Sequence, residues 1–175
     1  MVSKTMKILV YPHEILKTRA RPVEKIDGAL QKFIDDMIIM MYKAKGVGLA
    51  ANQVGETLRL FVMDVSGSDE SSNPIVIINP VITEVDGSEV AEEGCLSVPN
   101  YSAKLKRPAI VEVKGYDRHG KEIRLEADGL AARCIQHEID HLDGICFVDR
   151  LSPLKRSMFR KKWPKILESL EKKDG

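Results

Sequence analysis

Two histidines and a glutamate stand together in residues 136–141 (QHEIDH). His137 and His141 are four residues apart, so on a helix both rings face one side, one turn apart, and can reach a single ion. Glu138 lies beside the first ring, close enough to take a proton from water at that ion. These residue types and this spacing predict a metal-dependent hydrolase rather than a metal site without catalysis.

The alternative is a charged, solvated helix face on which such a string arises by chance. The neighbours favour a buried helix, because Leu130, Ile135 and Leu142 are apolar. Inward-facing histidines and a glutamate would then need polar partners, and a metal ion supplies them.

The third metal ligand is not fixed by this helix, since a catalytic zinc-type site usually has three protein ligands and a water. Extended zincin motifs place a third histidine where this chain has Phe147. A distant glutamate or one of the three cysteines therefore remains. Cys134 and Cys146 have apolar neighbours, and we interpret both as packing residues. Cys95 follows a glycine and precedes a proline, a setting that presents its side chain.

Residues 46–53 (GVGLAANQ) form a second notable segment, in which two glycines and two alanines make a thin wall for the backbone of a ligand. The segment lacks the Gly-Lys-Ser/Thr ending of a phosphate loop and the glycine spacing of a dinucleotide fold. Gln53 is a neutral amide donor that could stabilise an oxyanion near a metal. The alternative interpretation is a surface glutamine.

Composition and charge bound the class of protein. The 175 residues suit one domain with a single core, in which about 153–175 form a basic C-terminal helical extension. Charged residues make up 30%, and 27 Lys and Arg against 26 Asp and Glu give a net charge of +1, which indicates neither sequence-specific nucleic-acid binding nor membrane binding. Three irregularly spaced cysteines, and residues 1–14 without a secretory segment, predict a reducing, cytoplasmic setting.

Periodicity predicts the elements that must position these residues. Apolar spacing predicts a helix at 27–45, and Val- and Ile-rich runs predict strands at 58–65 and 74–85, joined by a polar connection at 66–73. The remaining expectations are a hairpin at 104–126, the metal-binding helix after the N-cap Asp128, and a basic C-terminal helix that Pro164 should kink or split. The predicted class is α+β, with a central metal-binding helix surrounded by short, mostly antiparallel strands and a helix towards each end.

Three segments together resemble the peptide deformylase family. Residues 46–53 match its Gly-x-Gly-x-Ala-Ala-x-Gln motif, residues 93–97 match Glu-Gly-Cys-Leu-Ser, and residues 136–141 match Gln-His-Glu-x-Asp-His. All three occur in the family's order and at about its spacing, and the similarity runs from about Ile8 to about Arg160. One motif alone would be weak, whereas the set of three is highly specific.

The resemblance implies a metal ion and a reaction. Cys95, His137 and His141 would hold one divalent ion with water as fourth ligand; Fe²⁺ is expected, with Zn²⁺, Ni²⁺ or Co²⁺ able to substitute. Glu138 would be the general base for removal of the formyl group from the N-terminal formyl-methionine of new bacterial proteins. The metal, Gln53 and the backbone N–H of Leu96 would stabilise the oxyanion.

The resemblance also implies how substrate and metal loop are held. The substrate backbone would lie along Val47, Gly48 and Gly94. The methionine side chain would enter a pocket built partly from Leu130, Arg133, Cys134 and His137. The alkyl stem of Arg133 would line the wall while its charge reaches water. Glu93 would pair with Arg107 and so brace the metal loop.

Formyl-methionyl peptides are thus the expected substrates, and in the resembled family the basic C-terminal helix can contact the ribosome. A solvated helix face is the alternative interpretation of that charge run. Rival functions are a zincin-type metallopeptidase, a thiol hydrolase that uses Cys95, and a non-catalytic metal-binding module. The metallopeptidase would cleave internal peptide bonds, the thiol hydrolase would need no metal, and the metal-binding module would tolerate Glu138→Gln.

Overall fold

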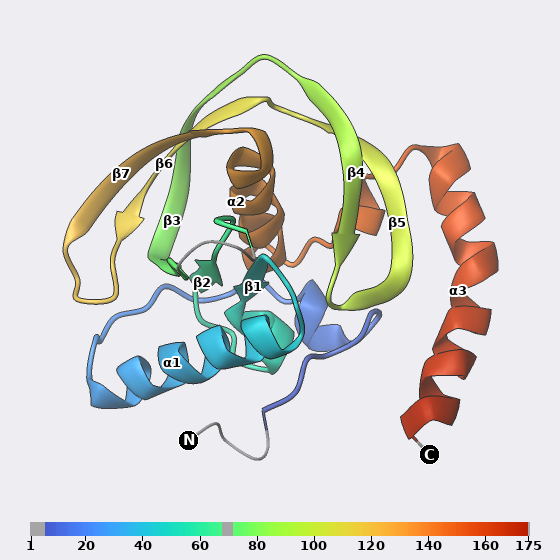
Figure 1. The fold of residues 1–175 in the computed structure, drawn as a ribbon, viewed down its shortest axis with the longest axis horizontal. Coiled ribbons are helices and arrows are strands. Elements are labelled where there is room, and N and C mark those ends of the chain that lie inside the picture. Colours follow the sequence, from blue (N-terminus) through green and yellow to red (C-terminus); the bar gives the residue numbers. More distant parts are fainter. Residues whose placement is uncertain (1–5, 68–71, 175) are drawn as a thin grey trace.

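The computed structural model describes residues 6–67 and 72–174, so the predicted 66–73 connection and residues 1–14 lie partly outside the described residues. A five-stranded sheet and a separate two-stranded hairpin stand on either side of helix α2, which spans Gly129–Leu142 (Figure 1). Each neighbouring strand pair in the two sheets is antiparallel. The predicted α+β class is therefore confirmed.

The larger sheet has the order β1-β2-β3-β6-β7. Its strands are Gly48–Ala50, Leu60–Met63, Ile75–Asp86, Ile110–Tyr116 and Glu122–Asp128. The hairpin consists of β4 and β5, which span Glu89–Cys95 and Val98–Arg107. Only residues 87–88 and 108–109 separate these strands from β3 and β6, so the hairpin continues from the ends of these two inner, paired strands and bends over α2 (Figure 1).

The strand predictions are partly confirmed. Strands β2 and β3 lie within or close to the predicted runs 58–65 and 74–85. The predicted hairpin at 104–126 is wrong in its first part, because residues 104–107 belong to β5 and pair with β4. Pro108 lacks an N–H and stands where the chain leaves the small hairpin for β6, which marks the break. Strand β3 has 12 residues, so the strands are not uniformly short.

Helix α1 (Gly28–Lys43) confirms the predicted N-terminal-half helix. The carboxylate of Asp27 accepts the N–H of Leu30 at 2.9 Å and caps the first turn. The buried face carries Leu30, Ile34, Met37 and Met41, and it packs with β2 to close one side of the core.

Helix α2 is the centre of the fold, since every residue from 132 to 142 is buried. Ile135, Ile139 and Leu142 pack into the same apolar cluster as Phe61 and Val111 of the larger sheet. The helix must therefore accept a run of buried polar side chains on its opposite face, the face towards the hairpin. Asp128 occupies the predicted N-cap position, although its side chain makes no capping hydrogen bond.

Helix α3 (Pro153–Asp174) continues through Pro164, so the predicted split is wrong. Pro164 is exposed, and its ring therefore costs the helix a hydrogen bond without disturbing the core. Phe159 and Trp163 are buried on the other face, where the Trp163 indole donates to the carbonyl of Tyr11 at 3.2 Å. None of the helices in the described part of the chain has the length and apolar character that a membrane span requires.

Candidate metal centre

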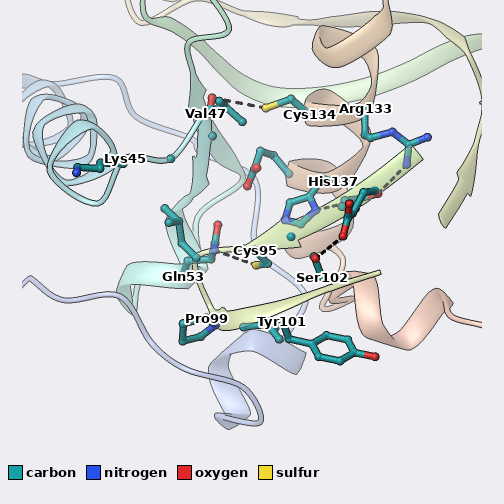
Figure 2. Close-up of a pocket in the computed structure, with 18 of the residues that line it drawn as sticks. Lys45, Val47, Gln53, Cys95, Pro99, Tyr101, Ser102, Arg133, Cys134 and His137 are labelled. Atoms are coloured by element: carbon teal, nitrogen blue, oxygen red, sulfur yellow. Dashed lines mark hydrogen bonds and ion pairs between the residues drawn. The ribbon is translucent and has the colours of Figure 1, made fainter. Parts of the chain in front are cut away.

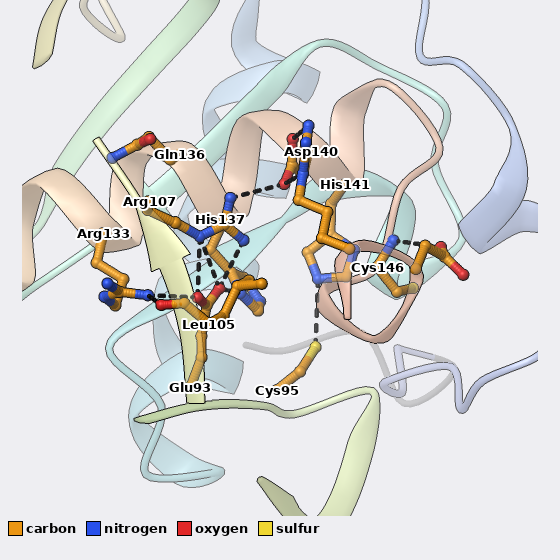
Figure 3. A network of polar contacts seen from close by, with 12 residues as sticks. Glu93, Cys95, Leu105, Arg107, Arg133, Gln136, His137, Asp140, His141 and Cys146 are labelled. Carbon is orange, nitrogen blue, oxygen red and sulfur yellow. Dashed lines mark hydrogen bonds and ion pairs between the residues drawn. The ribbon is translucent and has the colours of Figure 1, made fainter. Parts of the chain in front are cut away.

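The three predicted metal ligands converge although they come from two elements. Cys95 ends β4, whereas His137 and His141 project from α2. One ligand atom from each residue lies within 4.8 Å of the others, and the Cys95 Sγ is 3.2 Å from the His141 Nε2 (Figure 3). A cluster of one sulfur and two imidazole nitrogens matches the donor set of a single borderline-soft divalent cation.

Both imidazoles are buried, and their surroundings differ. Burial lowers the pKa of His141, so this ring is neutral and keeps a lone pair for a metal. Burial acts in the same direction on His137, but the nearby Glu138 carboxylate and the Cys95 side chain outweigh it and raise that pKa. The raised pKa reports an excess of negative charge around the His137 ring. A divalent cation fits such a site, because it would compensate that charge.

Glu138 is buried beside the cluster, and its Oε1 has no hydrogen-bond partner among the described residues. A buried carboxylate oxygen without a partner is costly unless a ligand or ion completes it. Burial raises the pKa of Glu138 to about 7, although His137 opposes this shift. A carboxylate with that pKa can take up and release a proton near neutral pH.

Glu93 holds His137 from the side away from Cys95. Its Oε1 accepts the His137 Nδ1 proton across 2.7 Å, which leaves Nε2 as the free ring nitrogen. The Arg107 guanidinium donates to both Glu93 oxygens, at 2.9 Å to Oε2 from Nε and at 2.7 Å to Oε1 from Nη2 (Figure 3). Burial alone would raise the pKa of Glu93, but the hydrogen bonds from His137 and Arg107 lower it to about 2.

The Gln53 amide faces the cluster from the opposite wall, at the end of the 46–53 segment. Its Nε2 donates to the Ser97 hydroxyl at 3.0 Å and lies 3.7 Å from the Cys95 Sγ (Figure 2). Its Oε1 accepts the Ala50 N–H at 2.9 Å, which fixes the orientation of the amide. Gln53 is fully buried, so the surface alternative is wrong.

A cavity of about 610 Å³ opens beside this cluster. Its walls include Gln53, Cys95, Leu96, His137 and Glu138 from the expected chemical residues. All six expected substrate-binding residues also line it, namely Val47, Gly48, Gly94, Leu130, Arg133 and Cys134 (Figure 2). His141 is completely buried behind this wall.

The guanidinium of Arg133 does not lie where we expected. The side chain is buried, and its charge does not reach water. Its guanidinium donates to the Glu93 Oε2 at 3.0 Å, to the Leu105 carbonyl at 3.0 Å and to the Glu89 carbonyl at 2.9 Å. These three hydrogen bonds offset the free-energy cost of removing the guanidinium from water, so the charge stays buried.

Comparison of the sequence with known proteins shows the family of this chain. A family model described as polypeptide deformylase matches residues 5–157. A peptide deformylase of Thermodesulfovibrio yellowstonii is 54% identical over 158 residues, which cover 90% of this chain and 96% of that protein. The chain belongs to the polypeptide deformylase family. It is accordingly a hydrolase that removes the formyl group from the N-terminal formyl-methionine of nascent polypeptides.

Solved deformylases share the whole architecture. A crystal structure of a peptide deformylase from Legionella pneumophila superposes with a TM-score of 0.89 at 48% identity, covering 95% of this chain and 97% of that one. A peptide deformylase from Synechococcus elongatus in complex with actinonin gives a TM-score of 0.85 at 40% identity, covering 94% and 88%.

Several residues around the centre of this deformylase were missed by the sequence analysis. Asp140, inside the helix motif, accepts the Arg107 Nη1 at 2.9 Å and the Arg150 Nε at 2.6 Å. Ser97 accepts the Gln53 amide, and the Asn52 side chain donates to the His141 carbonyl. Each of these residues lies within or directly beside a recognised motif, so their polar types at buried motif positions were a usable signal.

Proposed function

We propose that this deformylase holds one divalent ion with Cys95, His137 and His141 and uses Glu138 as its general base. The observation that carries the proposal is the convergence of three ligand atoms within 4.8 Å beside a buried carboxylate with an unpartnered oxygen. We propose Fe²⁺, with Zn²⁺, Ni²⁺ or Co²⁺ as substitutes, because sulfur and imidazole ligands suit these cations. When bound, the ion supplies a Lewis acid that polarises a carbonyl oxygen and acidifies water.

Glu138 carries the proton through the reaction. It takes a proton from water, and the oxygen of that water attacks the formyl carbon. Negative charge then grows on the formyl oxygen, towards which Gln53 Nε2 and the Leu96 N–H are the proposed protein donors. Glu138 next delivers the proton to the amine nitrogen as the carbon–nitrogen bond breaks. Formate and a free N-terminus leave.

The cavity supports a substrate placement of the same kind. We propose that the substrate backbone lies extended, like an added strand, along Val47, Gly48 and Gly94. The methionine side chain would enter between four of the α2 residues that line the cavity, namely Leu130, Arg133, Cys134 and His137. Glu93 and Arg107 would keep the His137 ring oriented rather than touch the substrate.

The proposal is tested with anaerobically prepared, iron-loaded protein and formyl-Met-Ala-Ser. We expect formate release by the parent protein and a loss of about 10²–10⁴-fold in kcat for Glu138→Gln, which keeps the side-chain shape but cannot accept a proton. Glu112→Gln, on strand β6 outside the cavity, is the matched control and should retain full activity. Full activity of Glu138→Gln with one metal per chain would refute its role as base.

The same assay separates the metal from a cysteine nucleophile. We expect removal of the metal by a chelator to abolish activity and re-addition of Fe²⁺ or Co²⁺ to restore it. Activity that survives metal removal and disappears on alkylation would instead identify Cys95 as a nucleophile. Because the Synechococcus elongatus relative was solved with actinonin, we further propose that this compound occupies the cavity and competes with substrate.

We propose a cytoplasmic site of action, because formyl-methionine occurs on nascent chains as they leave the ribosome. Exposed Arg160, Lys161 and Lys162 on α3 support a contact with ribosomal phosphates. Co-sedimentation with ribosomes should then weaken steeply with salt. A triple charge reversal at these positions should abolish it while deformylation of the free peptide persists.

A further inference from the structure

The proposed metal ligands come from two separate parts of the fold, the β4–β5 hairpin and helix α2. Cys95 lies on the β4–β5 hairpin, which forms no ladder with the larger sheet, and both histidines lie on α2. The geometry of the three ligand atoms therefore depends on what fixes the hairpin against α2. An error of about 1 Å between these parts is enough to damage a catalytic site.

Arg133 is the side chain of α2 that reaches into both strands of this hairpin. It is 6% exposed. Its Nη2 donates to the carbonyl of Glu89, at the start of β4, and its Nη1 donates to the carbonyl of Leu105, in β5. Glu89 and Leu105 are two register positions apart on paired strands, so one guanidinium fork fixes both of them.

The third bond of Arg133 acts on the metal centre itself. The Arg133 Nη1 donates to the Glu93 Oε2, while the Glu93 Oε1 accepts from the His137 Nδ1. Together with the two Arg107 bonds to Glu93, this bond sets the rotation of the carboxylate about its last torsion, so that Oε1 faces the ring (Figure 3). Arg107 of β5 is a second link, since it binds Glu93 of β4 and donates to Asp140 of α2, but it makes no bond to the Glu89 or Leu105 carbonyl that Arg133 holds.

We propose that Arg133 is a positioning residue of the metal centre, which clamps the β4–β5 hairpin onto α2 and orients His137 through Glu93. This inference rests on the proposed metal function of Cys95, His137 and His141. It assigns to the guanidinium of Arg133 a task separate from the lining of the cavity by its alkyl stem. Loss of the guanidinium should loosen two ligands at once, because Cys95 moves with the hairpin and His137 turns with Glu93.

The test measures metal binding rather than turnover. Co²⁺ affinity is determined under anaerobic conditions by competition with a chelator, and the ligand-field absorption of bound Co²⁺ is recorded. We expect Arg133→Met, which keeps the stem and removes the donors, to weaken Co²⁺ binding about 10- to 100-fold and to change the spectrum. Arg118→Met is the control: this half-buried arginine is paired with Asp35 away from the centre, and its loss should change neither quantity.

A milder variant decides the case if Arg133→Met does not fold. Arg133→Gln keeps one amide donor and should bind Co²⁺ with an affinity between those of the parent and a donor-free side chain. An unchanged Co²⁺ affinity and spectrum in whichever folded variant is obtained would overturn the proposal and leave Arg133 as a wall residue. If instead the parent protein binds no Co²⁺, the metal function itself fails, so the two failures are distinguishable.

Discussion

At the scale of single residues, Gly48 leaves space for the Glu138 carboxylate because it has no side chain. A Cβ on Gly48 would stand 2.5 Å from the Glu138 Oε2 and 2.7 Å from the Cys134 Sγ. Neither group can retreat easily, since both are buried in the packed face of α2. The glycine thus lets strand β1 lie against the proposed base.

We therefore expect Gly48→Ala to displace the Glu138 carboxylate and to lower kcat about 10²-fold, by analogy with other misplacements near 1 Å. The measurement is formate release by the iron-loaded variant, with metal content determined in parallel. Gly28→Ala is the matched control, because a Cβ at this exposed position meets nothing within 4 Å. Unaltered kcat in Gly48→Ala would show that Glu138 has room to move.

Residue-scale chemistry was the most predictable part of this chain. The three proposed ligand residues lie together, and Glu138 and the amide of Gln53 lie beside them, as the three motifs predict, because each motif is a local string whose spacing survives folding. The partners of Arg133 were not predictable from the sequence. They are two backbone carbonyls and a carboxylate on strands about 30 to 45 residues away, and only the tertiary placement of the hairpin brings them together.

At the scale of elements, α1, α2 and the central strands follow from apolar periodicity, whereas the β4–β5 hairpin does not. Strand β4 (EVAEEGC) carries three glutamates and lacks a clean alternation of apolar and polar side chains, although residues 101–106 of β5 do alternate. The hairpin is held by ladder bonds and by buried ion pairs, for which sequence periodicity offers no signal. Residues 104–107 were accordingly assigned to the wrong hairpin.

Helix α3 provides an element-scale prediction, since Phe159 and Trp163 anchor it against Tyr11 and its neighbours. We expect Trp163→Ala to destabilise the protein by about 3–5 kcal/mol, because it removes a large buried aromatic and leaves a cavity. Met158→Ala, on the exposed side of the same helix, should cost less than about 1 kcal/mol. The measurement is urea unfolding monitored by circular dichroism. Equal losses for the two variants would mean that α3 is not part of the cooperative unit.

At the scale of the whole molecule, acid stability depends in part on Asp64, which links α1 to the end of the β2 strand. Burial alone would raise its pKa, but hydrogen bonds from Ser66, Tyr42 and Asn73 lower it well below the ordinary value. A carboxyl with a lowered pKa stabilises the fold at pH values above its unfolded-state pKa, near 4. That contribution is lost as the pH falls further.

We therefore expect Asp64→Asn to lower the free energy of unfolding at pH 7 by about 1 kcal/mol, because solvent screens this half-buried carboxylate, and to flatten its fall below about pH 4. The measurement is urea unfolding between about pH 2 and pH 7, a range that includes the ordinary carboxyl pKa near 4. Glu171→Gln, an exposed position of α3, should leave the pH profile unchanged. An Asp64→Asn profile that parallels the parent would show that these hydrogen bonds do not depend on the charge.

The metal itself should act on the stability of the whole molecule, because its proposed ligands tie the hairpin to α2. A cation that binds only the folded state stabilises it by about 2.7 kcal/mol at a concentration of 100 times Kd. For a chain of this length, that energy corresponds to a rise of roughly 5–10 °C in Tm.

We expect this rise, measured by scanning calorimetry, when Zn²⁺ or Co²⁺ is added to the metal-free protein. His141→Ala should abolish it, whereas Cys146→Ala, which removes a buried thiol outside the ligand set, should lower Tm but keep the metal-induced rise. A rise that persists in His141→Ala would mean that the ion binds elsewhere and that the three proposed ligands do not cause the stabilisation.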